Sequence, residues 1–193
     1  AGTKIVGGPG YNQACHDMLS LQAYFGPRSK KLWGSTLRRA AAPKPAPDVV
    51  PDILVDRTLT IEQGGRTFEL ISAPDGETVD NLIVWMPKEK IAFTGNITGP
   101  VWNSMPFLCT LRRDKMRMVW NYLASMTKLR DLGAEMIITG HGDPIKGAAN
   151  IRADIDRMIG AVSWIRDHTH EGMKAGKTVH QLMREFAFPE DIR

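Results

Sequence analysis

The chain has 193 residues, of which 42% are hydrophobic and 24% are charged, and its formal net charge is +4. These values are typical of globular proteins and exclude a collagen-like, low-complexity or wholly disordered chain. No apolar run approaches the roughly 20 residues that span a bilayer, so we expect no membrane association. The basic residues gather in segments 28–39 and 111–117, and neither segment has aromatic side chains interleaved in the manner of a nucleic-acid-binding platform. This pattern favours a solvated face or an anionic small molecule over nucleic acid.

The cysteine content indicates the redox environment of the chain. Cys15 and Cys109 lie far apart in the sequence, and neither belongs to a CxxC pair. Two such thiols do not make a disulfide framework, so a reducing compartment is expected. The sequence therefore predicts a cytoplasmic protein.

The first quarter of the chain alternates between extended and helical patterns. Residues 4–7 are predicted to form a strand, for which nothing upstream supplies a neighbour. Apolar residues recur at helical spacing over residues 11–25, and Gly26 with Pro27 is expected to end that helix. After a short basic segment, the Pro-rich residues 40–47 predict an extended crossing rather than a domain boundary.

The middle of the chain predicts two β-hairpins. In residues 59–71 the two extended runs flank Gly64 and Gly65, which is a strong signal for a two-residue hairpin turn. Residues 82–94 contain two further apolar runs around a short polar turn. With the elements that follow, the hairpins indicate an α/β layered architecture.

The last part of the chain is predicted to follow the order helix, strand, helix, helix. These elements are expected at residues 115–132, 135–139, 148–174 and 178–186, with Gly133 ending the first helix and Thr178 as N-cap of the last. The helix over 148–174 is long for so few covering elements, so we expect Trp164 to contact a partner. The methionines of the first helix and the strand are predicted to lie in the core: Met116, Met118, Met126 and Met136.

Three Gly-containing loops, two of them directly after strands, carry polar side chains suited to chemistry. They hold Glu77, Asn96 and His141, which offer a carboxylate, an amide and an imidazole. Together such groups would suit a divalent metal such as zinc. Taken singly each signal is weak, and a lone Gly-His-Gly more often marks a turn with a surface or helix-capping histidine. Both interpretations of His141 therefore stay open from the residues alone.

In this order and spacing the loops resemble the second half of the metallo-β-lactamase superfamily, in which three loops after strands supply metal ligands. The closer likeness is to its alkyl sulfatase branch. That branch has a Pro-Gly-Glu-Thr-Asp-Asp loop, which Gly76-Glu77-Thr78-Val79-Asp80 resembles, and a segment like Thr110-Leu111-Arg112. The resemblance covers residues 50–193 well and residues 1–49 loosely.

The resemblance implies an α/β fold, the C-terminal part of a metallo-β-lactamase-like αββα sandwich. Residues 1–147 would form the partial domain, and residues 148–193 a helical segment that makes a homodimer. It also implies a parent protein that hydrolyses a small anionic ester, an alkyl sulfate being one candidate, with zinc-activated water. The implied metal ligands are Glu77, Asn96 and His141, and Arg112 is the implied substrate-binding residue.

Three departures from the family pattern bear on activity. The first metal motif, His-x-His-x-Asp-His, is absent, so we expect the chain to be a C-terminal fragment. Asn96 stands where the family has a bridging acid, and Phe107 where alkyl sulfatases place an asparagine. We therefore expect this chain alone to be inactive. The alternative is a degenerate, non-catalytic family member that acts as a dimerisation or binding module.

Overall fold

The computed structural model describes residues 2–34, 49–98, 102, 104–108 and 116–190. The Pro-rich crossing, Cys109 and Arg112 lie outside these residues. The strands are β1 (Val6–Gly7), β2 (Ile53–Leu54), β3 (Thr58–Gln63), β4 (Arg66–Ser72), β5 (Leu82–Met86), β6 (Ile91–Gly95), β7 (Met136–Thr139) and β8 (Ile145–Lys146). The helices are α1 (Tyr11–Ser20), α2 (Gln22–Trp33), α3 (Val119–Asp131), α4 (Ala148–Lys174) and α5 (Val179–Glu185).

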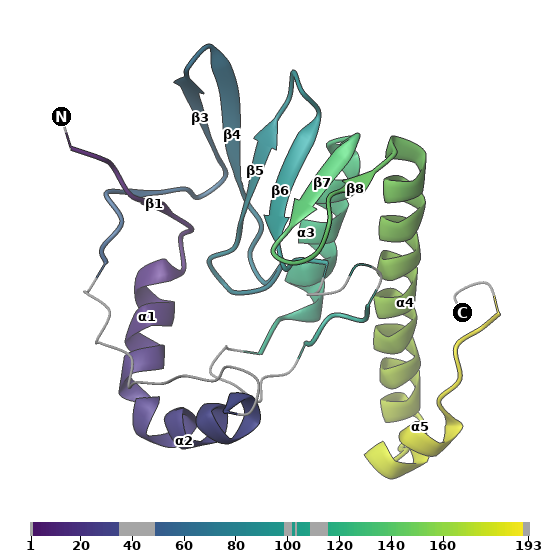
Figure 1. Ribbon diagram of the computed structural model, residues 1–193. Coiled ribbons are helices and arrows are strands. Elements are labelled where there is room, and N and C mark those ends of the chain that lie inside the picture. The colour runs from purple at the N-terminus through teal and green to yellow at the C-terminus, as the bar shows by residue number, and fades with distance from the viewer. Residues whose placement is uncertain (1, 35–48, 99–101, 103, 109–115, 191–193) are drawn as a thin grey trace.

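A six-stranded sheet in the order β3-β4-β5-β6-β7-β8 forms the centre of the molecule (Figure 1). The pairs β3–β4, β4–β5 and β5–β6 are antiparallel, and β6 pairs with β7 in parallel. Both predicted hairpins are confirmed. Gly64 and Gly65 have φ angles of 59° and 74°, as the predicted two-residue turn requires. No helix among the described residues is long and apolar enough to cross a membrane.

The N-terminal region corrects two expectations. Strand β1 does have a neighbour, because it pairs in parallel with β2, a segment that follows it in the sequence. Gly26 and Pro27 do not end the first helix: the break falls at Leu21, and Pro27 lies inside α2. A proline removes one backbone hydrogen bond of a helix, and in α2 this loss does not stop the helical path.

The C-terminal elements follow the predicted order with two differences. Helix α3 begins at Val119 rather than at residue 115, and Met118 before it is extended. Strand β8 was not predicted, because two residues are too few to show a period. Helix α4 has the predicted bounds, and α5 begins after Thr178 with a capping box formed with Gln181.

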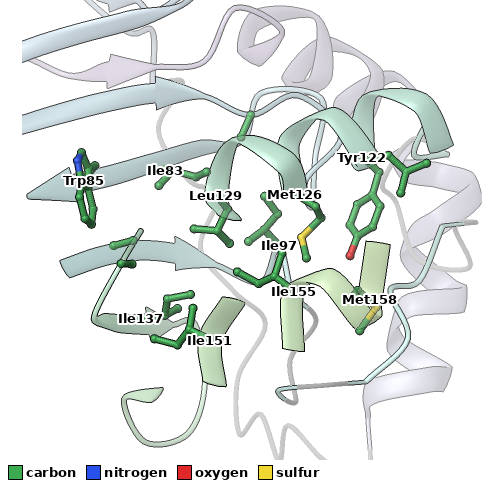
Figure 2. Close-up of a cluster of buried hydrophobic side chains, with 14 of the residues drawn as sticks. Ile83, Trp85, Ile97, Tyr122, Met126, Leu129, Ile137, Ile151, Ile155 and Met158 are labelled. Atoms are coloured by element: carbon green, nitrogen blue, oxygen red, sulfur yellow. The ribbon is translucent and has the colours of Figure 1, made fainter. Parts of the chain in front are cut away.

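The core lies between one face of the sheet and the helices α3 and α4. Ile83 and Ile137 from the sheet, Met126 from α3 and Ile155 from α4 are buried in one cluster (Figure 2). Trp164 is half-buried and packs against Phe186 and Phe188 of this chain, and its contact with a partner stays a prediction. The prediction that the methionines are core residues holds only in part: Met126 is buried and Met136 is half-buried, but Met116 and Met118 are exposed.

The opposite face of the sheet carries a row of apolar side chains in register. Leu70, Val84, Phe93 and Ile138 are paired across four neighbouring strands. All four are only partly covered, and Phe93 is 38% exposed. The six-stranded sheet is thus covered by α3 and α4 on one face, which corresponds to half of an αββα sandwich, and β1 and β2 form a separate two-stranded sheet.

Candidate functional site

The three predicted loops meet at one edge of the sheet. Strands β4, β6 and β7 run in the same direction, because β4 and β6 are each antiparallel to β5 and β7 is parallel to β6. Their carboxyl ends therefore lie at the same edge, which is where α/β folds place their sites. Glu77 follows β4, Asn96 follows β6 and His141 follows β7.

Asn96 contacts Glu77 through two hydrogen bonds. Its backbone N–H donates to Oε2 of Glu77 at 3.3 Å, and its side-chain Nδ2 donates to Oε1 at 3.0 Å. Each oxygen of the carboxylate thus has a donor from the same residue. Hydrogen bonds to an ionised carboxylate are stronger than those between neutral groups.

The third loop approaches Asn96 from the other side. The N–H of Gly140 donates to the carbonyl of Gly95 at 3.1 Å. A Cβ atom on Gly140 would lie only 2.3 Å from Oδ1 of Asn96, so a larger residue at this position would require the Asn96 side chain to move. His141 follows directly and is exposed, and its carbonyl accepts a hydrogen bond from the Thr139 hydroxyl. The structure therefore brings Glu77 and Asn96 into contact and places Gly140, the residue before His141, against Asn96.

The loop that carries Glu77 is held by polar side chains near and along α3. Arg117, just before this helix, is 8% exposed and donates from Nη1 to the carbonyl of Gly76 at 3.1 Å. Asn121 donates to the carboxylate of Asp75 at 2.7 Å. Farther along the helix, Ser125 and Lys128 donate to the carbonyls of Pro74 and Ser72, at 2.9 and 2.7 Å.

Sequence reasoning missed these anchoring residues. Asn121, Ser125 and Lys128 recur at intervals of four and three residues, which places them on one face of α3. The spacing of these polar residues was visible in the sequence, but only the spacing of the apolar residues of the same helix was used, to predict the core. A polar stripe of this kind is normally a solvated face, so only the tertiary structure shows that it binds a loop.

The residues of this chain do not by themselves fit a metal ion. Among the described residues no three His, Cys, Asp or Glu side chains come together, whereas a catalytic zinc has three protein ligands. Both oxygens of Glu77 already accept hydrogen bonds from Asn96. Oδ1 of Asn96 is buried and has no hydrogen-bond partner among the described residues, but a neutral amide does not offset the charge of a dication.

Comparisons with known proteins connect this site to a family. No family model matches the chain. It is 27% identical over 129 residues to a linear primary-alkylsulfatase of Pseudomonas sp. (strain ATCC 19151), covering 66% of this chain and 24% of that protein. It is also 27% identical over 132 residues to a beta-lactamase-like protein 2 homolog of Caenorhabditis elegans, covering 68% of this chain and 36% of that protein. The chain thus spans about a quarter to a third of the length of these relatives.

The solved structures agree with the sequence comparison. The stereoselective inverting sec-alkylsulfatase Pisa1 from Pseudomonas sp. superimposes with a TM-score of 0.82 at 16% identity, over 98% of this chain and 32% of that one. A metallo-beta-lactamase family protein from Thermus thermophilus gives a TM-score of 0.57 at 15% identity, over 85% of this chain and 54% of that one. The expected resemblance is confirmed: the chain has the metallo-β-lactamase-like fold and is similar in sequence to an alkylsulfatase.

Proposed function

We propose that this chain is the C-terminal portion of a hydrolase with the metallo-β-lactamase-like fold, and that its parent hydrolyses a small anionic ester such as an alkyl sulfate. The observation that carries the proposal is the meeting of the Glu77, Asn96 and Gly140–His141 loops at one sheet edge. Similarity to an alkylsulfatase supports the choice of substrate class.

The proposal assigns only part of the site to this chain. Glu77 and His141 are its contribution, and ligands from elsewhere in the parent would complete a zinc site. The half-covered apolar row around Phe93 supports this division, because a second layer of the fold would cover such a face. By itself the chain is expected to be inactive. Arg112 is retained as the proposed anion-binding residue, although it lies outside the described residues.

The experiment measures sulfate release from a primary alkyl sulfate in the presence of zinc, by the parent protein and by this chain. The parent should release sulfate, the chain should not, and Glu77→Gln in the parent should abolish most of the activity. Glu135→Gln is the matched control, because Glu135 is exposed and pairs with Lys90 away from the site. A parent that is inactive, or a Glu77→Gln variant as active as the control, would contradict the proposal.

A second candidate is a non-catalytic role in self-association. Met173, Val179 and Met183 near the C-terminal end of the chain are 64%, 63% and 70% exposed. A second copy of the chain could cover these apolar side chains, giving a homodimer through α4 and α5.

Sedimentation velocity at micromolar concentration tests the dimer. The unmodified chain and the control variant Lys88→Glu, which changes an exposed residue between β5 and β6, should sediment as dimers. Met183→Glu should shift the population to the monomer, because a charge would then be buried in the interface. A monomer for the unmodified chain would refute the dimer.

A further inference from the structure

Two of the metal-ligand positions implied by the family, Glu77 and Asn96, are hydrogen-bonded directly to each other. Here the neutral side chain of Asn96 bonds to the first loop and lies against the third. Nδ2 of Asn96 faces Glu77 at 3.0 Å, and Oδ1 lies where a Cβ on Gly140 would come within 2.3 Å. The amide therefore fills the space between the first and third loops.

Asparagine suits this place for a chemical reason. The carboxylate of Glu77 needs donors, and Asn96 supplies two of them, one from the backbone and one from the side chain. An aspartate would keep the backbone donor but would set a second carboxylate against the first, which costs stability unless a cation lies between them. Aspartate at position 96 would thus favour metal binding but would disrupt the contact that asparagine makes with Glu77.

We propose that in this chain by itself Asn96 is a positioning residue that holds the Glu77 carboxylate, and that this half of the site binds no metal ion without the further ligands of the parent. This proposal rests on the proposed function only in assigning Glu77 to the site of the parent protein. Its tests measure stability and metal binding, not hydrolysis. Hydrolysis by the parent and the properties of this chain are measured separately, so the two proposals can fail independently.

The first test is a double-mutant cycle between positions 96 and 140. The φ angle of Gly140 is not in the left-handed region, so alanine at 140 is hindered chiefly by the Asn96 side chain. Gly140→Ala should lower the Tm by roughly 5 °C with Asn96 present, and by much less in an Asn96→Ala background. An equal loss in both backgrounds would overturn the proposal.

The second test is the response to zinc. The Tm of the unmodified chain should change neither with zinc nor with EDTA. Asn96→Asp should lower the Tm by roughly 5 °C without metal, and zinc should restore it. Asn150→Asp is the matched control, because Asn150 is exposed on α4, and it should behave like the unmodified chain.

A spectroscopic measurement separates positioning from a merely structural role. Cobalt(II) added to Asn96→Asp should give visible absorption bands of a protein-bound ion, and the unmodified chain should give none. Zinc or cobalt binding by the unmodified chain that is lost in Glu77→Gln would overturn the proposal. So would an Asn96→Asp variant that responds to neither metal, because Asn96 would then not occupy the place of one.

Discussion

At the scale of single residues, Tyr122 is buried with its hydroxyl unsatisfied. This residue of α3 is fully enclosed in the core, and its hydroxyl has no hydrogen-bond partner among the described side chains (Figure 2). Burial raises the pKa of the Tyr122 phenol well above its ordinary value, and the positive charge of Arg117 offsets part of this rise. The neutral phenol is therefore the form that the folded chain contains at all ordinary pH values.

Replacing this phenol gives a pH-dependent prediction. At pH 7, Tyr122→Phe should leave the unfolding free energy unchanged or raise it by up to about 1 kcal/mol, because an unpaired buried hydroxyl is removed. Above pH 10.0 the unfolded phenol loses its proton while the folded one keeps it, so the unmodified chain should lose stability with rising pH. Urea unfolding of both proteins at neutral and alkaline pH measures the difference. A constant difference across this range would refute the raised pKa.

At the scale of elements, α3 has two faces with different tasks. One face contributes Leu123, Met126 and Leu129 to the core, and the other binds the loop of Glu77 through Asn121, Ser125 and Lys128. The same helix thus supports the sheet and fixes a loop of the candidate site. A change on its polar face should affect that loop without emptying the core.

Asn121→Asp tests this division. Asn121 is itself exposed but donates to Asp75, which is 4% exposed, so the substitution sets a second carboxylate against a buried one. We expect the unfolding free energy to fall by about 2 kcal/mol, and amide exchange over residues 73–81 to speed up. Both are measurable by urea unfolding and hydrogen exchange. The exposed control Asn150→Asp should stay within about 0.5 kcal/mol of the unmodified chain, and equal effects of the two variants would contradict the anchoring role.

At the scale of the whole molecule, the sheet and the long helix share one core. Ile155 of α4 is 1% exposed and belongs to the same buried cluster as Ile83 and Ile137 of the sheet. The predicted division into residues 1–147 and 148–193 cuts the chain just before α4. Whether the two parts unfold independently can therefore be tested with a residue of α4 that packs against the sheet.

We expect Ile155→Ala to lower the unfolding free energy by about 2–5 kcal/mol and to do so in a single transition, because the cavity it leaves lies between both parts. Thermal unfolding followed by circular dichroism and by tryptophan fluorescence measures this. Met173→Ala, on the exposed face of the same helix, should have little effect. Two separate transitions would instead favour the division into two units.

The open face of the sheet gives the second prediction at this scale. Phe93 is 38% exposed in the apolar row of this face. Phe93→Gln should therefore reduce binding of the dye ANS to the isolated chain, because it interrupts the apolar row. Phe107→Gln changes an exposed phenylalanine outside this row and should reduce dye binding less. The reverse ranking would show that the dye binds elsewhere.

The sequence by itself determined the elements whose signals are local. Gly64 and Gly65 specified a turn, the 3.6-residue period specified α4, and Thr178 specified the start of α5, because each signal acts within a few neighbouring residues. The resemblance to a family also came from local motifs, and it identified the fold correctly. The roles predicted for Glu77, Asn96 and His141 remain predictions.

Contacts between segments that are distant in the sequence were revealed only by the tertiary structure. The partner of β1 comes from a segment more than 40 residues later, and the loop of Glu77 is held by a helix that begins after the second hairpin. The sequence indicated that Asn96 is an unusual residue for a metal site. In the structure the amide of Asn96 bonds to Glu77 on one side and adjoins Gly140 on the other. This arrangement follows from strand order and register, which bring the three loops together at one edge of the sheet.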